Sequence, residues 1–249
     1  IYLPTMSKVK FSEDEKEEKE SEMIEPCATR IPGIIFFPGA LVSHTAYASM
    51  AAKLSDQGIL VVVMSYGPSR LTMDVSLCQQ RAQLVMHEVM HELPSFGLDI
   101  PVNEWILAGH SIGGTLALNA AATMTAINKV VLCGVGRDAM KVPSSLKESN
   151  KQVLVLNGSN DPFVTECTES QKQEFRECLP PSVTSENIND DAFNANPTKG
   201  GATTFVTIQG GNHAGFAHYG PQTYPKVDGK RTITIDEQEN IVVQNTLEL

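Results

Sequence analysis

Six short apolar runs divide the chain from residue 31 onwards, and they constrain its fold more than any other feature. The runs are Ile34–Phe37, Ile59–Met64, Trp105–Ala108, Val130–Cys133, Val153–Leu156 and Thr203–Ile208. Each is continuous rather than alternating, which is typical of strands buried on both faces of a parallel sheet. Segments with helical features follow five of these runs, over residues 47–56, 74–93, 112–124, 171–179 and 236–247. This alternation predicts an α/β fold with helices flanking a mainly parallel central sheet.

The first 30 residues of the 249-residue chain differ from the rest in charge. Glu13–Glu25 holds eight acidic residues and two lysines. A segment that repels itself and lacks apolar spacing predicts a disordered acidic tail over residues 1–30, followed by one domain over residues 31–249. Ser182–Ala202 is rich in Asn, Asp, Thr and Gly, so we expect a loop-rich, lid-like insertion over about residues 163–202.

Composition limits the partners and the compartment. A net charge of −10 argues against nucleic acid, which binds basic surfaces. The sequence contains no run of about 18 apolar residues, so it predicts no membrane span. The chain begins with Ile1, so we expect an upstream segment, such as a targeting signal or anchor, to have been removed. Composition leaves the compartment and the oligomeric state open.

The cysteines do not form a metal-binding pattern. The chain has five of them, at positions Cys27, Cys78, Cys133, Cys167 and Cys178. Five is an odd number, and the spacing matches no zinc signature. Free thiols are the favoured interpretation, and a Cys167–Cys178 disulfide stays open as the alternative.

A candidate nucleophile follows the third apolar run. Residues Gly109–Gly113 read G-H-S-I-G, a G-x-S-x-G pattern that arises by chance in roughly one such chain in ten. Its position between a predicted strand and an Ala-rich helix is the one that a nucleophile elbow needs. Gly109 and Gly113 supply the small residues on either side of the turn. Ser111 is therefore the predicted nucleophile.

Two later strand ends carry the matching acid and base. Asp161 follows the fifth apolar run, and His213 follows the sixth. The carboxyl ends of parallel strands meet at one edge of the sheet, where such folds bind ligands. The chain order Ser, Asp, His is typical of enzymes with a nucleophile elbow. A catalytic triad of Ser111, Asp161 and His213 is therefore predicted. The weaker alternatives are Asp190, Asp191, His218 and His110, whose side chain we expect to point away from the reacting atoms.

The negative charge of an acyl-transfer intermediate needs backbone N–H donors. One donor is expected from Ile112, directly after the nucleophile. The other is expected from Ala40, with Leu41 next, because the loop after the first strand carries Gly39 and so can approach closely.

A competing motif lies on the second predicted helix. His87-Glu88-Val89-Met90-His91 is H-E-x-x-H, the zinc-protease signature, and it is rarer by chance, roughly one chain in a hundred. Helical periodicity places an apolar stripe on the opposite face from both histidines; the stripe is Cys78, Ala82, Val85, Val89 and Leu93. We therefore expect both histidines to face water and no catalytic metal.

Several stretches also resemble a known family. Ile35–Val42, Gly109–Gly114, Asn157–Asp161 and Gly210–Phe216, with Tyr219–Gln222, resemble the α/β-hydrolase superfamily and its dienelactone-hydrolase-like branch of serine esterases. The resemblance runs from about residue 31 to the C-terminus. It implies ester hydrolysis by the predicted triad. Dienelactone hydrolases themselves generally use a cysteine nucleophile, so their substrate is not carried over.

These inferences predict a serine carboxylic-ester hydrolase that acts on a small-molecule ester without a cofactor. The residues that we expect to line its pocket are Tyr47, His110, Phe216 and Tyr219. Two alternatives stay open: another acyl hydrolase (a lipase, thioesterase or peptidase), and a non-catalytic binding protein with the same fold.

Overall fold

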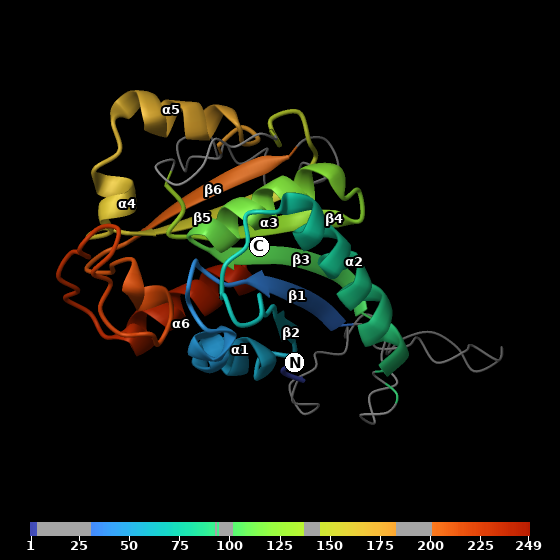
Figure 1. Cartoon of the computed structure of the whole chain (residues 1–249). Helices are drawn as coiled ribbons and strands as arrows, with labels where there is room; N and C mark the ends of the chain where they lie inside the picture. The colour runs from blue at the N-terminus through green and yellow to red at the C-terminus, as the bar shows by residue number, and fades with distance from the viewer. Residues whose placement is uncertain (4–30, 93, 95–101, 137–144, 183–200) are drawn as a thin grey trace, which may run out of the picture.

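The computed structural model describes residues 1–3, 31–92, 94, 102–136, 145–182 and 201–249. Its centre is a six-stranded sheet in which every neighbouring pair is parallel (Figure 1). The strands are β1 Ile31–Phe37, β2 Leu60–Val63, β3 Val102–His110, β4 Ile127–Cys133, β5 Gln152–Gly158 and β6 Ala202–Ile208. They lie in the order β2-β1-β3-β4-β5-β6. All six apolar runs therefore form strands, and the predicted α/β fold is confirmed.

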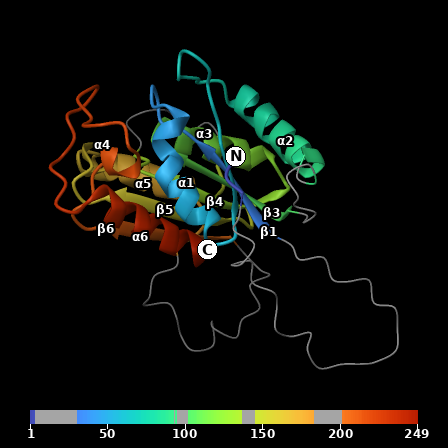
Figure 2. The same cartoon turned by 90° about the horizontal axis from the view of Figure 1, so that it is seen from below.

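Helices cover both faces of this sheet. They are α1 Ala48–Ser55, α2 Val75–Glu92, α3 Ile112–Thr123, α4 Pro162–Thr165, α5 Glu169–Glu177 and α6 Ile235–Leu247, with two 3-10 turns, η3 His44–Tyr47 and η7 Ala214–Phe216. Residues of α2, α3 and α5 join one hydrophobic cluster, and residues of α1 and α6 join the other. Figure 2 shows α1 and α6 running close to one another. The sequence did not predict α4 or η7, because four or three residues are too few for a helical period.

Strands in the middle of the sheet are buried on both faces, whereas the edge strand β6 is not. On β1, Ile34 packs into one cluster and Ile35 into the other, and both are at most 1% exposed. On β6, the pattern is broken by the exposed Thr204, Phe205 and Thr207. The difference arises because β6 is an outer strand of the sheet formed by the described residues.

The start of the chain contacts the opposite edge of the sheet. Tyr2 pairs with Val61 of β2 through N–H···O bonds of 2.8 and 3.0 Å. Residues 1–3 are thus ordered against a strand edge, in contrast to the predicted tail, because the edge offers unpaired backbone groups. The acidic run lies outside the described residues. The predicted lid is described only up to residue 182, where it holds α4 and α5.

Four of the cysteines have described positions, and all four are free thiols. Cys78, Cys133 and Cys167 are buried, and Cys178 is half-buried. Cys167 and Cys178 each contact a backbone carbonyl four residues earlier, of Phe163 and Glu174. The free-thiol interpretation is therefore confirmed for these four. Within the described residues, no helix combines the length and apolar character that crossing a membrane requires.

Candidate active site

Ser111 occupies a strained turn between β3 and α3. Its backbone has φ 55° and ψ −126°, a conformation that costs a residue other than glycine about 1–3 kcal/mol. The turn has no room for side chains on either side. A Cβ atom on Gly109 would lie 2.4 Å from the backbone of Gly113, and one on Gly113 would lie 2.0 Å from the carbonyl oxygen of Phe37. Strand, tight turn and helix therefore lift the Ser111 side chain away from the sheet, as an elbow requires.

Asp161 and His213 form a buried hydrogen-bonded pair. His213 Nδ1 lies 2.8 Å from Asp161 Oδ2, and the two side chains are 2% and 0% exposed. Because a carboxylate only accepts, Nδ1 carries the shared hydrogen, which leaves Nε2 of the neutral ring as an acceptor. The other carboxylate oxygen accepts the Phe163 N–H at 2.9 Å. That bond caps α4, with Pro162 at the first helical position, so the start of α4 fixes the orientation of the acid.

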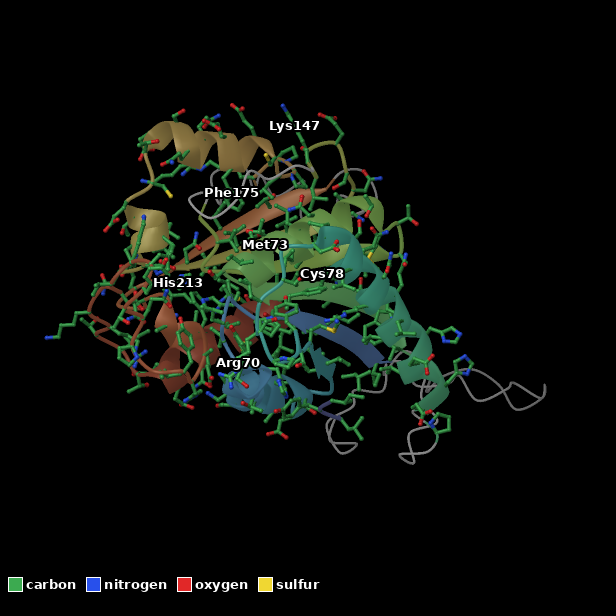
Figure 3. All side chains as sticks on the ribbon, viewed as in Figure 1. Arg70, Met73, Cys78, Lys147, Phe175 and His213 are labelled. Atoms are coloured by element: carbon green, nitrogen blue, oxygen red, sulfur yellow. The ribbon has the colours of Figure 1, made fainter. Side chains whose placement is uncertain are left out.

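The end of β4 brings Ser111 next to this pair. The Ser111 N–H donates to the Cys133 carbonyl at 2.9 Å. The next residue, Gly134, has φ 58°, and a Cβ there would lie 3.1 Å from His213 Nδ1 and 3.2 Å from Asp161 Oδ2. The three predicted triad residues thus meet at the carboxyl edge of the sheet. Figure 3 labels His213 at this edge, at the end of the sheet where α4 begins.

The Ser111 hydroxyl itself forms none of the hydrogen bonds made by the described residues. Its placement beside the pair rests on the backbone contacts through Cys133 and Gly134. Such bonds are commonly long or absent in ligand-free sites and tighten when a substrate binds.

The loop after β1 packs against the same elbow. The Gly39 N–H donates to the Tyr47 hydroxyl at 2.8 Å, and the Leu41 N–H donates to the Arg70 carbonyl at 2.7 Å. In the described part of the chain, the Ala40 N–H has no hydrogen-bond partner. Ile112 opens α3, where the first amides of a helix lack intrahelical acceptors. Of the predicted donors, Ala40 and Ile112 are therefore unengaged, whereas Leu41 is already bonded.

The four predicted pocket residues lie beneath the site rather than around an open cavity. Tyr47, His110 and Phe216 are at most 1% exposed, and Tyr219 is half-buried. We expected the His110 ring to point away from the reacting centre, and this prediction was wrong. The centroid of the ring lies 4.6 Å from that of His213. Burial, and then repulsion by His213, lower the pKa of His110 well below its usual value, so this ring stays neutral.

Asp228 and Gln238 hold the His213 segment in place, and neither was predicted from the sequence. The Asp228 carboxylate accepts the N–H groups of His213 at 3.1 Å and Ala214 at 2.7 Å. Gln238 of α6 accepts the Asn212 N–H at 3.1 Å and donates to the Asn212 carbonyl at 2.9 Å. Burial raises the pKa of Asp228, while its two N–H donors act in the opposite direction. Both residues lie 15 or more positions beyond His213, without a motif to connect them.

The alternative residues lie elsewhere. His87 and His91 are exposed on α2, with ring centroids 4.5 Å apart. The buried side of α2 carries Cys78 and Ala82, as the apolar stripe predicted, although Leu93 lies outside the described residues. Within the described residues, no three His, Cys, Asp or Glu side chains gather as a metal site.

The remaining acid and base candidates are also accounted for. His218 is half exposed and pairs with Glu239 at 3.1 Å. Asp190 and Asp191 lie outside the described residues.

Two of the cavities that the described residues form lie near the edge of the sheet, and no triad residue lines either of them. The larger, of about 790 Å³, lies between β5, β6 and α4–α5, where Val155 and Phe205 meet Phe175. The smaller, of about 220 Å³, lies between the loop after β1 and the loop after β2, and includes Pro38 and Val42 on either side of Ala40.

Known proteins share this fold. Three solved structures match at 15–16% identity: a ferulic acid esterase from Streptomyces cinnamoneus (TM-score 0.55, covering 87% of this chain and 65% of that one), an α/β serine hydrolase homologue from Coxiella burnetii (0.53, 86% and 84%) and an α/β serine hydrolase without a lid from Xanthomonas campestris (0.50, 90% and 85%). The chain thus spans less than two thirds of the length of the esterase. A search of curated proteins gave no match.

A family model gives the assignment. The model that describes the alpha/beta hydrolase family matches residues 33–194, more than half of the chain. This stretch contains most of β1, all of β2 to β5, the elbow at Ser111 and the acid at Asp161. The chain therefore belongs to the alpha/beta hydrolase family.

Proposed function

We propose that this protein is a serine carboxylic-ester hydrolase in which Ser111 forms an acyl-enzyme with the help of His213 and Asp161. The observation that carries the proposal is the buried 2.8 Å bond between Asp161 and His213 beside a serine at φ 55°. A carboxylate that fixes the tautomer of a histidine next to a nucleophile is the arrangement that activates a hydroxyl group. The family and the esterase among its structural relatives support a hydrolase of this kind.

The reaction begins when Nε2 of His213 takes the Ser111 proton and Oγ attacks the ester carbonyl carbon. Asp161 stabilises the imidazolium ring that forms, through the bond to Nδ1. The carbonyl π electrons move onto oxygen, and the N–H groups of Ala40 and Ile112 stabilise the oxyanion. Loss of one such donor typically costs about 100- to 1,000-fold in rate.

The tetrahedral intermediate collapses when its C–O bond to the alcohol breaks. His213 gives its proton to the leaving alkoxide, and an acyl group stays on Ser111. A water molecule then loses a proton to His213 and attacks the acyl carbon, which releases the carboxylic acid and returns the hydrogen to Ser111. No step requires a cofactor.

Covalent labelling by a fluorophosphonate probe tests this mechanism. We expect one equivalent of probe on Ser111 of the native protein, located by peptide mass spectrometry, and no labelling of Ser111→Ala. Hydrolysis of p-nitrophenyl esters of graded chain length should be lost in the same variant and should rank the acyl preference. A native protein that takes up no probe, or an alanine variant labelled equally well, would remove Ser111 as the nucleophile.

A chelator separates this proposal from zinc chemistry at His87 and His91. Ester hydrolysis should be unchanged by EDTA, because the proposed reaction uses none of the exposed side chains on α2. Loss of activity with EDTA that zinc restores would instead assign the reaction to the histidine pair on α2.

A further inference from the structure

We propose that Tyr47 and His110 form a buried bridge that fixes the position of the loop after β1, which carries the proposed oxyanion donor Ala40, relative to the base His213. The inference rests on the proposed function and assigns these two residues positioning roles in it. The bridge runs from the Gly39 N–H to the Tyr47 hydroxyl at 2.8 Å, and from that hydroxyl to His110 Nδ1 at 2.9 Å. From there it passes by ring contact to His213, with centroids 4.6 Å apart.

The hydrogen-bond directions in the bridge are set by chemistry. The Gly39 N–H can only donate, so the Tyr47 oxygen accepts it. The Tyr47 hydroxyl then has its own hydrogen to give, and His110 Nδ1 lies within reach to accept it. The neutral His110 ring therefore carries its hydrogen on Nε2, an atom that is buried without a hydrogen-bond partner among the described residues.

Close packing links the loop to the bridge on one side. A Cβ on Gly39 would lie 3.1 Å from His110 Nδ1 and 3.3 Å from the Tyr47 oxygen. The Gly39 backbone thus packs closely against both polar atoms of the bridge. Its neighbour is Ala40, the proposed oxyanion donor, so movement at Gly39 displaces the Ala40 N–H as well.

Ring contacts link the bridge to the base on the other side. The His213 ring contacts two rings, with its centroid 4.3 Å from that of Phe163 and 4.6 Å from that of His110. Phe163 is held by its N–H bond to Asp161, and His110 by its bond to Tyr47. His213 becomes a cation during the proposed reaction, and a second cation at this distance would oppose it. A neutral ring at position 110 avoids that repulsion, in agreement with the lowered pKa of His110.

The variant Tyr47→Phe tests the bridge, because it removes one hydroxyl group and keeps the ring. We expect kcat, normalised to the sites that a fluorophosphonate labels, to fall about tenfold or more, since the oxyanion donor loses part of its positioning. KM should stay within about twofold, because the bridge is buried away from the substrate. Tyr66→Phe is the matched control: its hydroxyl is also buried and has no partner in the described residues. The control should keep the kcat of the native protein.

Two substitutions of His110 separate the two ends of the bridge. In His110→Asn, the amide oxygen replaces Nδ1 as acceptor for Tyr47, but the ring that contacts His213 is lost. In His110→Phe, a ring remains, but the acceptor is lost. We expect each substitution to lower kcat. The kcat of the double variant Tyr47→Phe/His110→Phe should lie within about twofold of that of Tyr47→Phe alone, because both changes break the same bond.

Nitrogen-detected NMR gives a readout that does not depend on activity. The native His110 ring should show the neutral tautomer with hydrogen on Nε2, and Tyr47→Phe should shift the Gly39 amide and the His213 ring signals together. A change in kcat accompanied by those two shifts supports the bridge. A Tyr47→Phe variant with native kcat, or one whose His213 signals match the native protein, overturns it.

The outcomes separate this inference from the proposed function. If the native protein labels at Ser111 and Tyr47→Phe behaves like Tyr66→Phe, the function stands and the bridge is wrong. If the native protein neither labels nor hydrolyses esters, the proposed function is wrong, and the coupled shifts of the Gly39 and His213 signals alone decide whether the bridge exists.

Discussion

Two pairs of histidines in this molecule have almost the same spacing and opposite surroundings. The rings of His87 and His91 are 4.5 Å apart, and those of His110 and His213 are 4.6 Å apart. The first pair is exposed on α2, whereas the second is at most 2% exposed at the edge of the sheet. Each pair has a carboxylate nearby: Glu88 lies 3.4 Å from His87, and Asp161 lies 2.8 Å from His213.

The difference shows that proximity of reactive side chains is a poor guide to chemistry by itself. One helical turn brings His87 and His91 together, so their proximity needs no tertiary structure. His110 and His213 meet only because β3 and β6 end at the same edge of the sheet, and burial then excludes competing water. A site in which the protein fixes the tautomer, the neighbours and the solvent access is the one expected to react.

Replacing the carboxylate beside each pair gives the largest expected contrast. We expect Asp161→Asn to lower kcat for ester hydrolysis by about 10,000-fold, because the amide favours the wrong tautomer of His213. Glu88→Gln should leave kcat unchanged. Steady-state kinetics on a p-nitrophenyl ester measures both. Equal effects of the two substitutions would contradict the contrast between the pairs.

Asp228 sharpens the contrast, because only the buried pair has its backbone held by a carboxylate. In Asp228→Asn, an amide N–H would face one of the two N–H groups that the carboxylate now accepts. We expect kcat to fall about tenfold through displacement of His213, the factor that corresponds to about 1.4 kcal/mol. Asp74→Asn is the control, because Asp74 also accepts a backbone N–H, from Leu77 at 3.0 Å, but at the start of α2. A native kcat in Asp228→Asn would show that the carboxylate does not position His213.

The buried pair should also make the stability of the protein depend on pH, through His110. The pKa of His110 lies below 6.5 in the folded protein, because of burial and then of His213. As the pH falls below about 6.5, the unfolded chain binds a proton there and the folded chain does not. Stability is therefore lost on acidification, with a slope of up to about 1.4 kcal/mol per pH unit.

Urea unfolding between pH 7.5 and 5 measures this loss. Relative to the native protein, His110→Asn should flatten the fall in the free energy of unfolding, because it removes the group whose pKa burial lowers. An unchanged pH dependence in His110→Asn would mean that His110 does not cause this loss of stability.

The smallest expected effect is a change in the free energy of unfolding caused by the strained backbone at Ser111. Ser111→Gly should raise the free energy of unfolding by about 1 kcal/mol relative to Ser111→Ala, because glycine adopts φ 55° without strain. Gln83→Gly, on the exposed face of α2, should lower it by about 1 kcal/mol. Thermal and urea unfolding check both signs. A loss of stability at Ser111 would mean that the turn stores no strain.

The sequence predicted the fold well because the sheet is buried. Each apolar run forms a strand or contains one, as Val153–Leu156 does within β5, and the helix expected over 112–124 spans Ile112–Thr123. Continuous burial leaves a pattern that single residues reveal. The prediction failed where local period was absent, as in α4, or where an edge exposes one face, as at Phe205.

The site was predictable to the extent that its residues end strands. Ser111, Asp161 and His213 each follow an apolar run, and their common edge follows from parallel pairing. The supporting groups were not predictable, because Asp228 and Gln238 reach the His213 segment only through the tertiary fold. The side-chain direction of His110 was wrong for a related reason: His110 ends β3, and the rings that it contacts, those of Tyr47 and Phe216, reach that face of the sheet only through the tertiary fold.

The attachment of α6 to the base segment has a consequence for how the protein is made. Gln238 bonds to both backbone groups of Asn212, and α6 follows β3 and the serine elbow in the chain, so it leaves the ribosome after them. A nascent chain that has already exposed β3 and the serine elbow therefore still lacks the support for its base. Reactivity toward a fluorophosphonate should appear during translation as a step when α6 docks, and so should report on the docking of α6 rather than on the presence of the nucleophile.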